Sequence, residues 1–292
     1  MPSALSPPLL IRGAEPKLDH LESLLSDMGS VLVCFSGGVD SAFVLAVAHR
    51  VLGDRAVAMT AVSPSLAPSE RELAIEVAQQ IGARHELIES HEIDDESYVA
   101  NESDRCFHCK SELYRLTTEK RPLWGLAHVV NGTNMDDLGD YRPGIEAAKR
   151  AGVRSPLVEA EFRKDDIRRV ASLLGLSVWD KPAAACLSSR LPYGTRVTRA
   201  RLAQIAALES DLRALGFQQV RVRWHEVSSK GEASMARVEV GDAELSRAFE
   251  QRDAITRAGK RHGFAYVTLD LEGYRMGSHN EVLGSKRLPV VS

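Results

Sequence analysis

The chain has 292 residues, of which 44% are hydrophobic, 5% aromatic and 26% charged, and its net charge is -3. These values predict a packed globular protein of one large or two modest domains. The small negative charge excludes a general basic field for nucleic acid, so we expect no nucleic-acid partner. The apolar runs are strand-sized and the first residues lack the pattern of a secretory leader, so we expect no membrane segment and a cytoplasmic protein.

Strands and helices are predicted to alternate through the first part of the chain. Leucines at helical spacing predict a helix over residues 16–28, followed by a strand at VLVCF, residues 31–35. Next come a helix over 41–52, a strand over 56–62, a helix over 68–81, a strand over 84–88 and a later strand over 128–133. This alternation predicts an α/β domain over residues 1–195, with a parallel sheet covered by helices on both faces.

Residues 181–198 are rich in Pro, Ala, Ser and Gly, which predicts a long functional loop and a domain boundary near Arg196. Beyond it, RARLAQIAALESDLRALGF predicts a helix ending at Gly216. Strands are predicted over 219–225, 236–240 and 264–269, with a helix over 242–258 before the last. We therefore expect a smaller α+β domain over residues 196–292.

The segment CFSGGVDS, residues 34–41, ends the first strand of the sheet and begins a helix. In an open α/β sheet this position commonly meets a phosphate group. SGGVDS resembles the PP-loop of the ATP pyrophosphatases, which adenylate a substrate oxygen and release pyrophosphate. The resemblance implies that the backbone at Gly37 and Gly38 approaches the phosphates and that the hydroxyls of Ser36 and Ser41 donate to them. It also implies that Asp40 holds Mg²⁺ or orients the loop. A glycine turn followed by a simple helix cap is the alternative.

A second polar segment follows the predicted strand over 128–133. Gly132, Thr133 and Asn134 resemble the segment that faces the nucleotide in the same superfamily. We include these three residues and Arg190 in the predicted ATP site. A polar turn without a ligand is the alternative for this segment.

The four cysteines predict different roles. Cys34 lies in an apolar strand and is expected to be inert packing. Cys106 and Cys109 form a C-x-x-C pair, and Cys186 lies in the loop KPAAACLSSRLPYGT, where neighbouring positive charge favours the thiolate. Cys186 is therefore the candidate sulfur donor or ligand. Three thiolates can hold a [4Fe-4S] cluster with one iron open to sulfide, whereas structural zinc lacks a second ligand pair.

Six segments together resemble one family: CFSGGVDSAF, NESDRCFHCK, GTNMDDLGDYRPG, KPAAACLSSRLPYGT, RVRWHE and VTLDLEGYRMGS. They are similar to the LarE family of pyridinium-3,5-biscarboxylic acid mononucleotide sulfurtransferases, and the match spans nearly the whole chain. The resemblance implies a fold of the adenine nucleotide alpha hydrolase type. It also implies that ATP and Mg²⁺ adenylate a carboxylate of this small nucleotide, and that sulfur insertion gives the thiocarboxylates of the nickel-pincer cofactor of lactate racemase.

Two sulfur routes are implied by this resemblance. In one, the loop cysteine, here Cys186, gives up its sulfur and becomes dehydroalanine. In the other, three cysteines, here Cys106, Cys109 and Cys186, hold a [4Fe-4S] cluster that carries sulfide. Because all three are present, we predict the cluster form, with a sulfide donor protein as a partner.

The resemblance also implies a use for the second domain. Arg221 and Arg223 alternate along one strand and therefore share a face. With Arg275 they are similar to the family's binding site for the substrate phosphate, and a solvated strand face is the alternative. Glu209 and Glu239 are implied as cation ligands near a subunit interface, and the family's assembly implies a homo-oligomer, a hexamer.

Two other functions fit parts of the pattern. A PP-loop tRNA thiolase is the main rival among enzymes, but the acidic balance and the lack of a basic stripe count against it. A nucleotide sensor without chemistry would retain the fold, yet Ser36, Asp40, Ser41 and the three thiols are intact.

Overall fold

The computed structural model describes residues 15–139, 143–227 and 233–275. By compactness these residues form two units. The first contains the described residues of 1–63, 68–92 and 104–184, and the second contains those of 64–67, 93–103 and 185–292. The division into functional domains at residues 1–195 and 196–292 stays a prediction.

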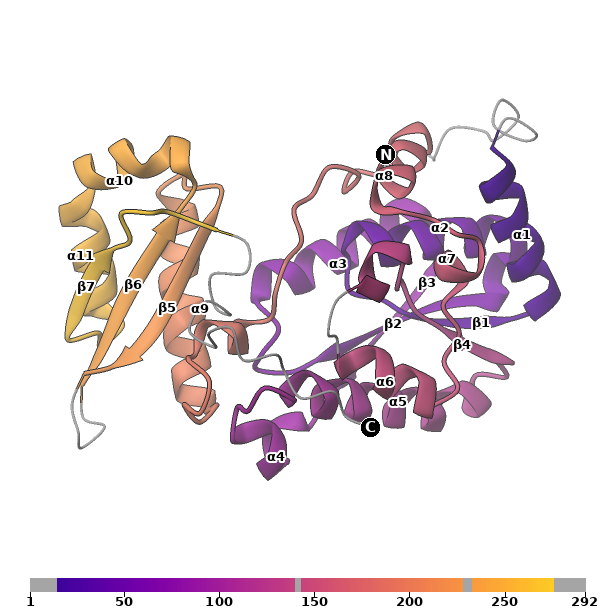
Figure 1. Cartoon of the computed structure of the whole chain (residues 1–292), viewed down its shortest axis with the longest axis horizontal. Coiled ribbons are helices and arrows are strands. Elements are labelled where there is room, and N and C mark those ends of the chain that lie inside the picture. The colour runs from indigo at the N-terminus through magenta and orange to yellow at the C-terminus, as the bar shows by residue number, and fades with distance from the viewer. Residues whose placement is uncertain (1–14, 140–142, 228–232, 276–292) are drawn as a thin grey trace. The chain divides into compact units, whose positions relative to one another are not determined.

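The first unit is built on a parallel sheet (Figure 1). The strand order is β3-β2-β1-β4, and the strands are β1 (Val31–Cys34), β2 (Ala56–Val62), β3 (Arg84–Glu89) and β4 (His128–Val130). Its helices are α1 (Pro16–Met28), α2 (Val39–Leu52), α3 (Pro68–Ile81), α5 (Arg105–Leu123), α6 (Pro143–Arg150), α7 (Pro156–Glu159) and α8 (Lys164–Leu173).

Alternate residues of the central strand face two separate cores. Val31 and Val33 of β1 pack with buried residues of α1, α2, α3 and α8, whereas Leu32 and Cys34 pack with those of α5 and α6. A strand buried on both faces requires a nearly continuous apolar run, which VLVCF supplies. The predicted α/β class, with helices on both faces of a parallel sheet, is confirmed.

The second unit contains a three-stranded sheet of order β5-β6-β7. Strands β5 (Val220–Glu226) and β6 (Ser234–Val240) are antiparallel, and β7 (Tyr266–Leu269) runs parallel to β6. The helices are α9 (Arg199–Ala214), α10 (Leu245–Glu250) and α11 (Arg252–Arg261), with the short α4 (Glu96–Val99) from an earlier segment. Leucines at positions 202, 208 and 212 of α9 are fully buried, which anchors this helix in the core of the unit.

Several helices differ from the sequence prediction, two of them substantially. The helix predicted over 242–258 is instead a 3₁₀ turn over Asp242–Glu244 followed by α10 and α11. Gln251, with φ -91° and ψ 14°, is the C-cap of one and the N-cap of the next, so the chain turns and both Ala248 and Ile255 are buried. The CFHC segment lies in helix α5, which no periodicity predicted because few of its residues are buried.

None of the helices in the described part of the chain combines the length and apolarity needed to cross a membrane.

Candidate active site

The loop between β1 and α2 is closed by the hydroxyl of Ser41. Its Oγ accepts from the backbone N–H of Ser36 at 3.2 Å and donates to the carbonyl oxygen of Gly38 at 3.1 Å. The Ser36 hydroxyl lies 3.2 Å from the same Oγ. Both predicted serines therefore shape the loop from within, and the start of α2 directs its backbone N–H groups towards it.

Glycine is required at the first of the two loop glycines. Gly37 has φ +71°, in the left-handed region, and a Cβ built there would lie 2.8 Å from the Cα of Ala74 in α3. A side chain at this position is therefore excluded by both conformation and space.

The carboxylate of Asp40, in the first turn of α2, is held from two sides. Lys164 Nζ lies 2.5 Å from its Oδ2, and the side-chain amide of Asn134 donates to its Oδ1 at 3.4 Å. About a quarter of each charged side chain is exposed, at 28% for Lys164 and 27% for Asp40. The Lys164 ammonium and the Asp40 carboxylate thus lie together beside the loop, at the first turn of α2.

Sequence reasoning missed Lys164. It begins α8, 124 residues after Asp40, and no local pattern connects the two. Only the folded chain places this ammonium group beside the loop.

The predicted GTN segment does lie against the loop. A Cβ at Gly132 would be 2.8 Å from the backbone N of Ser41, so this glycine lets the segment after β4 approach the start of α2 closely. Asn134 is buried, and its Oδ1 accepts from the N–H of Asp136 at 3.0 Å, which orients its amide towards Asp40. Gly132 and Asn134 are therefore brought together with Asp40 and Ser41.

The cysteines of the first unit differ in exposure. Cys34 is buried, and burial raises the pKa of its thiol to about 12, so it stays protonated near neutral pH. Cys106 is exposed and Cys109 half-buried, and neither forms a disulfide. Because they are three residues apart on α5, they share one face of the helix.

In the second unit, Arg190 fixes the backbone next to Cys186. The Cys186 side chain is exposed and directly precedes a 3₁₀ turn, Leu187–Arg190. Arg190 donates to the carbonyl oxygens of Ala185 at 2.7 Å and Cys186 at 3.2 Å, and its Nε donates to the carboxylate of Glu209 at 2.9 Å. The predicted contact of Arg190 with ATP stays a prediction.

The predicted phosphate-binding arginines are in distinct settings. Arg221 is 9% exposed, and its guanidinium carbon lies 4.4 Å from the ring centroid of Tyr274. Arg223 donates to Glu239 at 2.9 Å and to the carbonyl oxygen of Ser189 at 2.8 Å. Because both are buried, the alternative of a solvated strand face does not hold for them.

Arg275, the third predicted phosphate ligand, forms an ion pair of 2.6 Å with Glu272.

The carboxylates of Glu209 and Glu239 are each 1% exposed and bind arginines. Glu209 accepts from Arg190 and Arg213, and although burial opposes it, the Arg190 guanidinium holds the pKa of Glu209 below its usual value. Glu239 accepts from Arg223 and Arg237. Their observed contacts order the arginines, and the cation-binding role stays a prediction.

The described residues contain no group of three or more His, Cys, Asp or Glu side chains arranged to hold a metal ion. Cys106 and Cys109 belong to the first unit and Cys186 to the second. The three-thiol site therefore stays a prediction.

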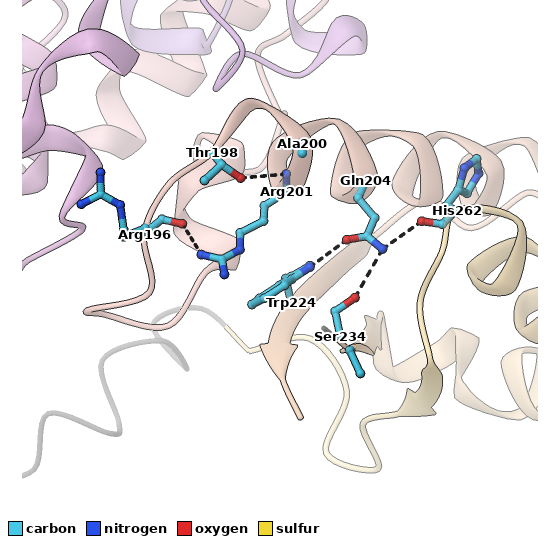
Figure 2. Close-up of a pocket in the computed structure, with 9 residues that line it drawn as sticks. Arg196, Thr198, Ala200, Arg201, Gln204, Trp224, Ser234 and His262 are labelled. Carbon is cyan, nitrogen blue, oxygen red and sulfur yellow. Dashed lines mark hydrogen bonds between the residues drawn. The ribbon is translucent and has the colours of Figure 1, made fainter. Parts of the chain in front are cut away.

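A separate pocket of about 560 Å³ lies in the second unit, at the start of α9 (Figure 2). Arg201 stacks on Trp224, 4.3 Å from the ring centroid. The Gln204 amide accepts from the Trp224 indole at 2.8 Å and donates to the carbonyl oxygen of His262 at 2.8 Å. The polar groups that line this pocket largely form hydrogen bonds with one another, so we assign no ligand to the pocket.

Comparison with known proteins identifies relatives along nearly the whole chain. A family model described as asparagine synthase matches residues 21–125, which include the loop after β1. An uncharacterized protein of Synechocystis sp. is 45% identical over 271 residues, covering 92% of this chain and 98% of that protein. An uncharacterized protein of Methanocaldococcus jannaschii is 26% identical over 245 residues, covering 84% and 90%.

A third relative has a named activity. The pyridinium-3,5-bisthiocarboxylic acid mononucleotide synthase of Lactiplantibacillus plantarum is 38% identical over 269 residues, covering 92% of this chain and 95% of that protein. The family match and the loop geometry agree on a nucleotide-activating domain that uses ATP. The chain belongs to the LarE family of ATP-dependent sulfurtransferases and contains a PP-loop domain.

Proposed function

We propose that this protein uses ATP to adenylate a carboxylate of pyridinium-3,5-biscarboxylic acid mononucleotide and then replaces AMP with sulfur. The name of the Lactiplantibacillus plantarum relative supports the substrate, because the bisthiocarboxylic acid is what sulfur exchange at two carboxylates would give. The PP-loop supports the activation step.

The observation that carries the proposal is the setting of Asp40. Its carboxylate is held between Lys164 and Asn134 at the first turn of α2, beside the hydroxyls of Ser36 and Ser41. The positive end of the helix, the ammonium group and the hydroxyl donors all favour a negatively charged ligand in this loop. A triphosphate with its α-phosphorus near Lys164 is the ligand that this set fits.

The activation step forms one bond and breaks one. A carboxylate oxygen of the substrate attacks the α-phosphorus of ATP, the bond from that phosphorus to the bridging oxygen breaks, and pyrophosphate leaves. Charge accumulates on the phosphate oxygens, and Lys164 and the N-terminus of α2 stabilise it. Asp40 fits Mg²⁺ as a hard oxygen donor, since the bond that Asn134 gives its Oδ1 is long, and the ion would offset the charge of the triphosphate.

Sulfur transfer is assigned to Cys186. Its thiol is exposed and its backbone is fixed by Arg190, so the sulfur has a defined point of attachment. The thiols of Cys106, Cys109 and Cys186, none of them in a disulfide, fit a [4Fe-4S] cluster by ligand type, and such a cluster would supply sulfide. In the alternative route the Cys186 sulfur displaces AMP from the acyl carbon to form a thioester. Loss of the Cα proton then breaks the Cβ–S bond, which leaves the thiocarboxylate on the substrate and dehydroalanine at position 186.

Arg221 is the arginine best placed for the substrate phosphate. Among the described residues it makes no ion pair, and its guanidinium is stacked on Tyr274 rather than bound to a carboxylate. Arg223 instead has Glu239 as its partner, and Arg275 has Glu272. A hexameric assembly and a sulfide donor protein are further proposals from the family resemblance, and a cytoplasmic location is a further proposal from the sequence.

Anaerobic turnover with ATP, Mg²⁺ and the mononucleotide tests the proposal. We expect AMP, pyrophosphate and thiocarboxylate to form together, and added tRNA to leave the rate unchanged. Lys164→Met should lower AMP formation by about 10²-fold, the usual effect of removing one charge-stabilising donor. Lys149→Met, on an exposed position of α6, is the matched control.

Cys186→Ser should still release pyrophosphate and form the acyl-adenylate, but it should form no thiocarboxylate. A wild-type protein that forms no AMP in the presence of the mononucleotide would refute the proposed function.

A further inference from the structure

Three buried hydroxyl groups form a closed ring beside the Cys186 loop. The oxygen atoms of Ser65 and Tyr98 are 2.5 Å apart, those of Tyr98 and Ser188 are 2.6 Å apart, and Ser188 donates to Ser65 at 3.2 Å. One arrangement of the protons satisfies all three hydroxyls: Ser188 donates to Ser65, Ser65 donates to Tyr98, and Tyr98 donates to Ser188. Each hydroxyl then donates one hydrogen bond and accepts one. All three residues belong to the second unit and are less than 5% exposed.

The ring is attached to the two residues that follow Cys186. The N–H of Leu187 donates to the carbonyl oxygen of Ser65 at 2.9 Å, and Ser188 is itself a member of the ring. Leu187 and Ser188 are buried, whereas Cys186 and the three alanines before it are exposed. The exposed Cys186 therefore directly precedes two buried residues whose positions are fixed by hydrogen bonds.

The segment that carries Tyr98 also binds the rest of this loop. Asn101, fully buried and with φ 60°, donates its side-chain amide to the carbonyl oxygens of Pro192 at 2.7 Å and Thr195 at 2.9 Å. Its own carbonyl accepts from Gly194 at 3.0 Å. Residues 98–101 thus form several hydrogen bonds with the part of the loop that follows Cys186.

We propose that Tyr98 is a positioning residue for sulfur transfer: through the hydroxyl ring it fixes the backbone that carries the Cys186 thiol. The inference rests on the proposed role of Cys186. A reacting sulfur must approach an acyl carbon within a narrow range of distance and direction, and an error near 1 Å can cost about 10²-fold in rate. Loss of one ring hydroxyl leaves two buried polar groups with one bond fewer each, so the loop shifts or loosens.

Tyr98→Phe tests the inference because it removes the hydroxyl oxygen from the hydroxyl ring and retains the aromatic side chain that packs in the core. We expect pyrophosphate release in a single turnover to stay within about twofold of wild type and thiocarboxylate formation to fall about tenfold or more, so that the acyl-adenylate accumulates or is hydrolysed by water. Tyr266→Phe, at a side chain that is 61% exposed, is the matched control and should leave both rates unchanged. Ser188→Ala, which breaks the ring from the loop side, should give the same uncoupling as Tyr98→Phe.

A spectroscopic readout separates positioning from stability. A trifluoromethyl tag on Cys186, in a Cys106→Ser and Cys109→Ser background, should give one fluorine resonance when Tyr98 is present and a shifted or multiple resonance in the Tyr98→Phe variant. An unchanged ratio of pyrophosphate to thiocarboxylate in both ring variants, with an unchanged resonance, overturns the inference. If Cys186→Ser retains sulfur transfer, the proposed function of Cys186 is refuted. A changed resonance in the Tyr98→Phe variant would then show only that Tyr98 anchors the loop, and the positioning role in sulfur transfer would be overturned as well.

Discussion

Replacing Gly132 with alanine tests whether the contact between β4 and the PP-loop positions the nucleotide. The new Cβ would lie 2.8 Å from the backbone N of Ser41 and 3.0 Å from the carbonyl carbon of Asp40. These are backbone atoms at the start of α2, so they cannot rotate away as a flexible side chain would. To reach the 3.4 Å of an ordinary contact, the segment after β4 and the start of α2 must separate by about 0.6 Å.

Two effects follow from this displacement. Overpacking of this kind lowers the free energy of unfolding by about 1–3 kcal/mol. Because Asp40 and Ser41 move with the backbone, kcat/KM for ATP should fall about tenfold or more, given that an error near 1 Å can cost about 10²-fold. Urea unfolding followed by circular dichroism measures the first effect, and pyrophosphate release at varied ATP measures the second.

Gly139→Ala is the matched control, since a Cβ at Gly139 would meet no atom within 4 Å. Both substitutions add the same methyl group in the same segment, so their difference isolates the contact. The reasoning would be refuted if Gly132→Ala unfolded within about 0.5 kcal/mol of the control and had the same kcat/KM for ATP.

Four further predictions concern other parts of the molecule. Gly37→Ala should abolish ATP binding in a filter assay, because the residue has φ +71° and no space beside Ala74. Arg221→Met should raise KM for the mononucleotide about tenfold without changing KM for ATP, whereas the exposed Arg257→Met should change neither. Cys34 should resist iodoacetamide at pH 8 in a peptide map, because burial raises its pKa to about 12. Glu209→Gln should cost about 3–5 kcal/mol in urea unfolding at neutral pH, since it leaves Arg190 buried without its counter-charge. Arg190 holds the folded pKa of Glu209 below its ordinary value of 4.5, so the wild-type advantage over Glu209→Gln is complete above pH 4.5 and should shrink as the pH falls below it.

Much of the fold was predictable where local patterns are strong. The predicted helices over 16–28 and 68–81 and the strand over 56–62 have the observed bounds. Their apolar periodicity and their flanking Pro and Gly residues are local signals. Helix α5 lacks such a signal because its surface is largely polar, and the break at Gln251 depends on packing in the second unit.

In the candidate site, too, the residues that follow from a local sequence pattern were predictable, and those brought together only by the fold were not. The loop from Ser36 to Ser41 was predictable from one short segment, since glycine conformation and helix start are local properties. Lys164 was not, because its pairing with Asp40 joins residues 124 positions apart. Tyr98 and Ser65 were also missed, since buried hydroxyls show their role only when the fold brings them together.

The central claim is that a substrate carboxylate attacks the α-phosphorus of ATP in the PP-loop site before sulfur enters. The most direct test uses mononucleotide whose carboxylate oxygens carry the heavy stable isotope, with mass analysis of the AMP released in a single turnover. The account predicts one heavy oxygen in AMP for each thiocarboxylate formed, because the carboxylate oxygen leaves with AMP when sulfur replaces it. Unlabelled AMP, or ADP and inorganic phosphate in its place, would contradict the account.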